Sequence, residues 1–194
     1  MVPSVALSSV AIVPKSDHIE DPTIASLRQT LCSESAPLAR RFRALFSLKH
    51  LGCLSPPTEQ TLPAIHAIAA AFRSPSALLK HELAYCLGQT HNMAAAPFLR
   101  ERLEDLKEDP ICRHESAEAL GALGDVKSIK LLRRLRDDPS EEDVVRETCE
   151  IAVARLEWES GKDEGSEKIK ARYGECRCRR SILEARIIID VRTL

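Results

Sequence analysis

The stretch LLKHELAYCLGQ, at residues 78–89, is similar to a second stretch, ICRHESAEALGA, at residues 111–122. The His-Glu dipeptide of the first stretch aligns with the same dipeptide in the second. An offset of 33 residues is typical of repeat arrays in which each repeat is one pair of helices. One such pair cannot bury its apolar side alone, so successive pairs stack on one another. These two stretches therefore predict a stacked array of helices.

Two further stretches of the chain align with this pair, one on each side. VVRETCEIAVARL, at residues 144–156, follows at the same offset and has Glu147 in the histidine position. RFRALFSLKHLG, at residues 41–52, precedes at an offset of 39 and has Phe42 in the histidine position. The extra residues fall in a proline-containing stretch between the two copies. The chain thus contains four copies of one helical pattern.

Each copy is preceded by a second helical pattern, and the residues between the patterns are typical of helix ends. Ser76 and Asp109 are predicted N-caps, and Pro110 suits a first helical position. Gly124 and Asp125 are predicted to end one helix and to cap the next. The sequence therefore predicts an all-α solenoid of the HEAT type with about four antiparallel helix pairs. The preceding patterns occupy residues 23–33, 61–72, 94–106 and 127–138.

The composition agrees with close-packed helices and excludes several classes of function. Hydrophobic residues make up 44% of the 194-residue chain and aromatic residues only 4%, with many Ala and Leu. No apolar run reaches the roughly 18 residues of a membrane span. The formal net charge of -1 gives the chain as a whole no excess of positive charge for binding nucleic acid. We therefore expect a cytoplasmic protein that binds neither nucleic acid nor membrane.

The pattern divides the chain into three parts. Residues 1–20 are expected to be a disordered leader, residues 21–158 form the predicted array, and residues 159–194 are a charged linker and an unassigned tail. The seven cysteines are expected to be reduced, and mostly buried as small apolar side chains. They are Cys32, Cys53, Cys86, Cys112, Cys149, Cys176 and Cys178.

The phase of the apolar residues predicts where the two His-Glu pairs face. The three later copies carry small or apolar residues at four positions relative to the histidine position. One lies two residues before it, and the others lie two, five and six residues after it. With about 100° per residue, this stripe lies roughly opposite the histidine. His81 and His114 should therefore face away from the core onto a common concave surface, with each glutamate on its flank. The stripe comprises Leu79, Leu83, Cys86, Leu87, Cys112, Ser116, Ala119, Leu120, Val145, Cys149, Ala152 and Val153.

Equivalent histidines on neighbouring repeats predict a metal site. Helices that pack about 10 Å apart bring two such imidazoles within reach of one ion. Two histidines with one carboxylate suit non-haem iron(II) with open positions for oxygen, and zinc fits the same ligands less distinctively. The alternative is a solvated pair, which is the usual role of a single His-Glu on a helix face. Recurrence in the two middle repeats, and replacement in the outer two, favours the metal site.

KHELAYCLGQ, at residues 80–89, and RHESAEALGALGD, at residues 113–125, closely resemble the deoxyhypusine hydroxylase family. The resemblance covers roughly residues 23–158. It implies a HEAT-repeat di-iron monooxygenase, an oxidoreductase of hypusine biosynthesis. Such an enzyme uses Fe²⁺ and O₂ to hydroxylate the deoxyhypusine side chain of a translation factor, its protein substrate. This post-translational modification completes hypusine.

Carried onto this chain, the family's ligand motifs fall on His81, Glu82, His114 and Glu115. The resemblance implies that both histidines and Glu115 are direct ligands of one iron. Glu82 is expected near the open coordination positions or beside the cationic substrate, and it is the candidate catalytic residue.

The chain departs from this family in its extent. The family has two four-repeat halves, each with two His-Glu motifs, and the di-iron centre lies between them. This chain resembles the first half only, so pairing with a second half or with itself is expected. The tail at residues 171–194 matches no repeat and is expected to come from an altered or prematurely ended reading frame. The alternatives to an enzyme are a non-catalytic protein-binding scaffold, a truncated fragment and a single-metal structural site.

Overall fold

A computed structural model of the chain describes residues 22–161, and that part contains helices and no strand. The leader predicted at residues 1–20 lies outside the described residues, as do Cys176, Cys178 and the tail from residue 162. Short 3-10 turns, η1 to η3, accompany the α-helices. The elements are α1 (Pro22–Cys32), α2 (Leu38–Gly52), α3 (Thr61–Ala69), η1 (Ala70–Arg73), α4 (Ala77–Gln89), η2 (Met93–Ala95), α5 (Ala96–Glu104), α6 (Pro110–Leu123), η3 (Val126–Ser128), α7 (Ile129–Asp137) and α8 (Asp143–Ser160).

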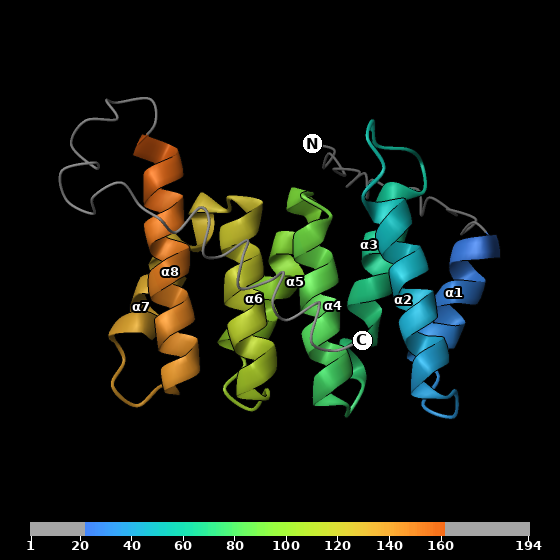
Figure 1. Cartoon of the computed structure of the whole chain (residues 1–194), viewed down its shortest axis with the longest axis horizontal. Helices are drawn as coiled ribbons and strands as arrows, with labels where there is room; N and C mark the ends of the chain where they lie inside the picture. Colours follow the sequence, from blue (N-terminus) through green and yellow to red (C-terminus); the bar gives the residue numbers. More distant parts are fainter. Residues whose placement is uncertain (1–21, 162–194) are drawn as a thin grey trace, which may run out of the picture.

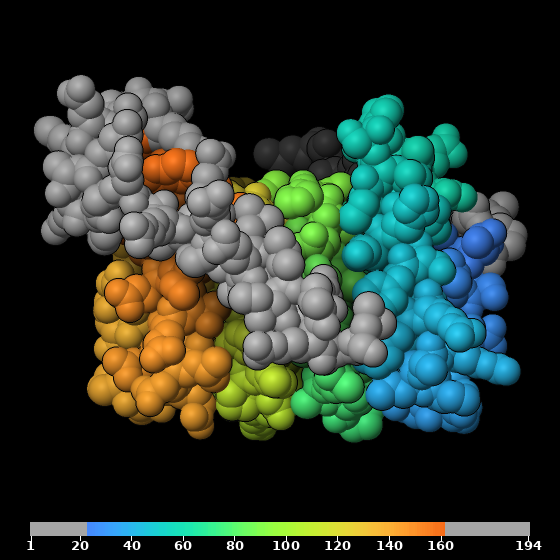
Figure 2. All heavy atoms as spheres, viewed as in Figure 1, coloured from blue at the N-terminus to red at the C-terminus, as the bar shows by residue number. Residues whose placement is uncertain are grey.

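The helices form four hairpins that stand side by side in two layers. Figure 1 shows α2, α4, α6 and α8 in front and the first helices of the hairpins behind them. The front layer is packed most closely between α4 and α6 and between α6 and α8. In the space-filling view, the coloured atoms on the face turned toward the reader belong mainly to α2, α4, α6 and α8 (Figure 2). The predicted all-α, HEAT-like array is confirmed.

The core of the array consists of the stripe that the sequence predicted. All twelve of its residues, from Leu79 in α4 to Val153 in α8, are buried. Leu83 and Leu87 have no exposed surface at all. Burial of this stripe fixes the rotation of α4, α6 and α8 about their axes. The opposite face of each of these helices therefore carries the histidine position.

The helix ends agree with the sequence except at Asp125. The hydroxyl of Ser76 accepts a hydrogen bond from the Leu79 N–H (3.3 Å), and Asp109 accepts one from the Ile111 N–H (3.0 Å). Gly124 ends α6 with a φ of 75°, in the left-handed region that favours glycine.

The prediction that Asp125 caps the next helix is wrong. Its side chain makes no capping hydrogen bond and is fully buried. Its carboxylate instead pairs with the Arg100 guanidinium and accepts a hydrogen bond from the Ser128 hydroxyl. A buried carboxylate needs such charged or polar partners more than a helix end needs a cap.

The cysteines divide into two groups. Cys86, Cys112 and Cys149 are buried, and burial raises the pKa of each thiol to about 12. Cys32 and Cys53 are exposed, which the sequence did not anticipate. Cys32 is the last residue of α1 and Cys53 directly follows α2, and side chains at helix ends are less covered by neighbouring helices.

Candidate metal centre

The two histidines occupy the same position in consecutive second helices. His81 is the fifth residue of α4, and His114 is the fifth residue of α6. Burial of the apolar stripe turns both positions outward, so the imidazoles lie on one face of the front layer. This arrangement follows from the repeat alone, because equivalent residues on stacked helices are neighbours.

A buried arginine directly before His114 fixes the first turn of α6. The Arg113 Nε–H donates a hydrogen bond to the Leu103 carbonyl (3.1 Å), at the end of α5. The Arg113 guanidinium also pairs with the buried carboxylate of Glu141 in the next repeat. Lys80 and Arg146 occupy the position equivalent to Arg113 in the neighbouring repeats, but the sequence pattern predicts no role for this residue. The same Nε-to-carbonyl bond, over ten residues, joins Arg41 to Leu31 and Arg146 to Arg136.

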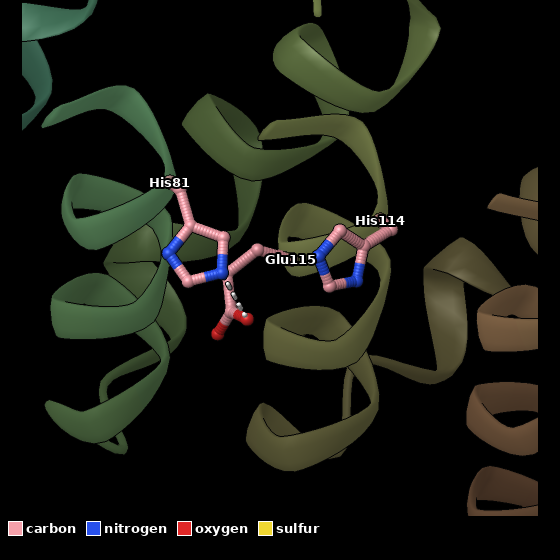
Figure 3. Close-up of side chains that lie close together, drawn as sticks. All are labelled: His81, His114 and Glu115. Atoms are coloured by element: carbon pink, nitrogen blue, oxygen red, sulfur yellow. Dashed lines mark ion pairs between the residues drawn. The ribbon is translucent and has the colours of Figure 1, made fainter. Parts of the chain in front are cut away.

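Three potential ligands meet between α4 and α6. The ring centroids of His81 and His114 are 5.6 Å apart, and the ring planes are tilted by 42°. Glu115 Oε2 lies 3.3 Å from His81 Nε2. One donor atom from each of His81, His114 and Glu115 lies within 4.8 Å of the others. Figure 3 shows the Glu115 carboxylate next to the His81 ring, with the His114 ring on the same side of the helices.

The direction of stacking explains why Glu115 joins the two histidines. Ala119, one turn after Glu115, is the residue of α6 that touches α4 at Gly88. Residues four apart lie on the same side of a helix, so the Glu115 side chain also points toward α4. The flank that sequence analysis assigned to the glutamate is thus the side that faces the preceding repeat.

Glu82 occupies the equivalent flank of α4 and therefore faces α2 rather than α6. Its Oε1 lies 3.4 Å from His81 Nδ1, on the other side of the imidazole from Glu115. The corresponding residue of α2 is Phe42, which has no ligand atom to offer. Glu82 therefore contacts the site through His81 and is not part of the three-residue group.

The two carboxylates give the two histidines opposite electrostatic environments. Interactions with the carboxylates of Glu115 and then Glu82 raise the pKa of His81 to about 9, despite the opposing effect of burial. Burial lowers the pKa of His114, and the neighbouring His81 lowers it further, against the attraction of Glu115. Without a bound metal, His81 is therefore a positively charged imidazolium near neutral pH, while His114 is a neutral imidazole.

The side chains at this point fit a divalent metal ion. Within residues 22–161, His81 Nδ1 is buried and has no hydrogen-bond partner, because Glu82 is close but poorly oriented. His114 is already a neutral imidazole, the form that binds metals. Two imidazoles and one carboxylate would suit an ion with further open coordination positions, as in iron(II) sites with two histidines and one carboxylate.

Comparison with known proteins places these repeats in a family context. The HEAT-repeat family matches residues 65–154. A deoxyhypusine hydroxylase of Neosartorya fischeri is 65% identical over 150 residues, which are 77% of this chain and 45% of that protein. The chain is a relative of the deoxyhypusine hydroxylases. That of Phaeosphaeria nodorum is 67% identical over 152 residues, 78% of this chain and 46% of that protein.

A solved structure agrees with the sequence comparison. Human deoxyhypusine hydroxylase, in complex with glycerol, superposes with a TM-score of 0.64 at 44% identity, over 73% of this chain and 46% of that chain. The chain thus spans about half the length of the deoxyhypusine hydroxylases that it matches. The resemblance seen in the sequence is confirmed.

In the part that the structure describes, no helix combines the length and apolar character needed to cross a membrane.

Proposed function

We propose that this chain provides one metal-binding half of a deoxyhypusine hydroxylase. The reaction would be the hydroxylation of a deoxyhypusine side chain on a translation factor, which completes hypusine. The convergence of His81, His114 and Glu115 from two consecutive repeats carries this proposal. The names of the relatives support the same reaction.

The metal in this proposal is Fe²⁺. His81 and His114 would each bind it through an imidazole nitrogen, and Glu115 would bind it through a carboxylate oxygen. Bound iron(II) would supply the ability to activate O₂, which none of the side chains has by itself. Zinc accepts the same three ligands but has no redox chemistry.

The carboxylates have further roles in the proposal. Glu115 and Glu82 would place two carboxylates beside a metal held by His81 and His114. Glu82, whose Oε1 lies 3.4 Å from His81 Nδ1, would attract the cationic amine of the substrate side chain. This assigns Glu82 the catalytic role through contact with substrate, and leaves direct metal binding to the other three residues.

The number of ligands sets what one array can do. The donor group of the described residues consists of two imidazoles and one carboxylate, which suits one ion. A second iron would need ligands from another surface, provided by a second half or by a second copy of this chain. We place the reaction in the cytoplasm, in keeping with free thiols at all five described cysteines.

Anaerobic loading of the full chain with Fe²⁺, followed by metal analysis, tests the proposed site. We expect about one iron per chain, because three ligands surround one ion. His81→Ala and His114→Ala should lose most of the iron and keep their helix content. His50→Ala is the matched control, since His50 is exposed and lies outside the donor group.

The same preparation, assayed on a deoxyhypusine-bearing protein together with the half of a relative that this chain does not match, tests the reaction. Hydroxylation that depends on His81 and His114 supports the proposal. A folded wild type that binds no iron would favour the non-catalytic scaffold. A chain that retains zinc but rejects iron would favour a structural metal site.

A further inference from the structure

Two small residues set the closest approach of α4 and α6. Gly88 lies two turns after His81, and Ala119 lies one turn after Glu115. A Cβ atom added at Gly88 would stand 2.8 Å from the Ala119 Cβ and 3.1 Å from its Cα. Carbon atoms that are not bonded prefer separations of about 3.5–4.0 Å. The two helices can therefore pack this closely only because residue 88 has no side chain.

The same contact recurs one repeat later without the metal ligands. A Cβ atom added at Gly121 of α6 would stand 3.1 Å from both the Cα and the Cβ of Ala152 in α8. However, α8 carries Glu147 and Thr148 in place of the His-Glu pair, and it contributes nothing to the donor group. The array thus has two similar close contacts, and the donor group spans only the first.

We propose that Gly88 is a positioning residue of the metal centre, and that it sets the α4–α6 separation at which His81 shares an ion with His114 and Glu115. This inference rests on the metal site proposed above and adds a residue that does not touch the metal. Gly88 would act through the helix backbone, not through a side chain.

The geometry makes the metal centre sensitive to this contact. His81 lies about 10 Å along the helix axis from Gly88, and Glu115 about 6 Å from Ala119, at 1.5 Å per residue. A helix is rigid over such lengths, so a displacement at residue 88 also moves residue 81. Bonds from nitrogen or oxygen to a metal are about 2.0–2.2 Å long. Their ligands must be held to within about 0.5 Å. Because the crowding at residue 88 involves backbone and Cβ atoms, no side-chain rotation can relieve it.

Gly88→Ala in the full chain tests the role of this contact. We expect the folded variant to bind Fe²⁺, titrated anaerobically against a chromogenic chelator, about tenfold or more weakly than wild type. Gly121→Ala is the matched control, since it crowds the equivalent contact between α6 and α8 and leaves the contact that sets the α4–α6 separation unchanged. It should lower thermal stability to a similar extent, and its Fe²⁺ affinity should stay within about threefold of wild type.

A compensating change separates positioning from folding. Gly88→Ala combined with Ala119→Gly moves the methyl group to the other side of the contact. The double variant should regain most of the Fe²⁺ affinity. The double variant has the same number of helical glycines as wild type, so its recovery would come from relief of the α4–α6 contact and not from helix propensity. If Gly88→Ala does not fold, Ala119→Ser enlarges the same contact by one atom and should weaken Fe²⁺ binding by a smaller factor.

The outcomes distinguish this inference from the proposed function. If the wild-type chain binds no Fe²⁺, the metal site itself is refuted. If wild type binds and a folded Gly88→Ala variant binds equally well, only the role of Gly88 is refuted. Equal losses of affinity in Gly88→Ala and Gly121→Ala would also refute it, as would a double variant that stays as weak as Gly88→Ala.

Discussion

His81 and His114 are equivalent residues of adjacent repeats, with ring centroids 5.6 Å apart, yet their pKa values are shifted in opposite directions. His81 lies between two carboxylates, Glu115 on one side and Glu82 on the other. The glutamate adjacent to His114 in sequence points toward His81 instead. One repeated dipeptide therefore produces a protonated and a neutral imidazole at neutral pH.

Metal binding should release a proton from His81. Because the pKa of His81 is raised to about 9, the metal-free site is protonated below that pH. Affinity for Co²⁺, used as a spectroscopic probe, should therefore rise by about tenfold per pH unit from pH 7 and level off near pH 9. Titration calorimetry in buffers of different ionisation enthalpy measures the protons released. Glu82→Gln removes one of the two charges that raise the pKa of His81. The affinity for Co²⁺ should therefore level off at a lower pH in this variant. Affinity that does not change between pH 7 and 9 would contradict the assignment.

Two leucines of α4 should separate the core from the outer face. Leu87 is fully buried and Leu78 is exposed. We expect Leu87→Ala to lower the free energy of unfolding by about 2–5 kcal/mol, the usual cost of this truncation in a packed core. Leu78→Ala is the matched control and should change it by less than about 0.5 kcal/mol. Urea unfolding followed by circular dichroism measures both variants. Equal effects would show that the helix faces are wrongly assigned.

Breaking the buried ion pair between Arg113 and Glu141 should destabilise the protein far more than breaking the exposed pair between Arg133 and Glu157. Both side chains of the first pair are nearly fully buried, so Arg113→Ala leaves an unpaired carboxylate. We expect a loss of about 3–5 kcal/mol in unfolding free energy. Arg133→Ala should cost less than about 1 kcal/mol, since both side chains of the pair with Glu157 are exposed. Urea unfolding at low and high salt checks the difference, which should persist in salt. A small effect of Arg113→Ala would remove the argument that this residue anchors α6.

A single array should bind iron without hydroxylating its substrate. One donor group on one face suits one ion, and repeats stacked in line do not face each other across a cleft. We expect size-separated, iron-loaded monomer to be inactive on a deoxyhypusine-bearing protein. Activity should appear only in fractions where a second set of ligands is opposed to the first, as a two-fold dimer of this chain would provide. Turnover by a verified monomer would overturn this expectation.

Much of this arrangement could be predicted from repetition in the sequence. The stripe that includes Leu83 and Leu87 determines which face of α4 is buried, and the opposite position of His81 follows from helical geometry. The proximity of His81 and His114 follows from their equivalence. The direction in which Glu115 points could not be predicted this way. It depends on which side of α6 meets α4, and the periodicity of one helix does not contain that information.

Two other features were also beyond the sequence pattern. Asp125 has the residue type and position of a helix cap, but the presence of Arg100 nearby in space makes a buried ion pair more favourable. In the sequence, Gly88 is one small residue of the repeat, equivalent to Gly121. Its importance appears only when the distance from its position to Ala119 is measured, because contacts between helices depend on tertiary packing.

The orientation of Glu115 toward the preceding repeat gives the array a direction. Each complete ligand set takes one histidine from a repeat, and a histidine with its adjacent glutamate from the next repeat. A row of such motifs would therefore form one site fewer than it has motifs, and a lone motif would form none. The first glutamate of any row has no histidine before it to join. In this chain that residue is Glu82. The geometry that completes the ligand set therefore also leaves the Glu82 carboxylate at the edge of the set, available for another role.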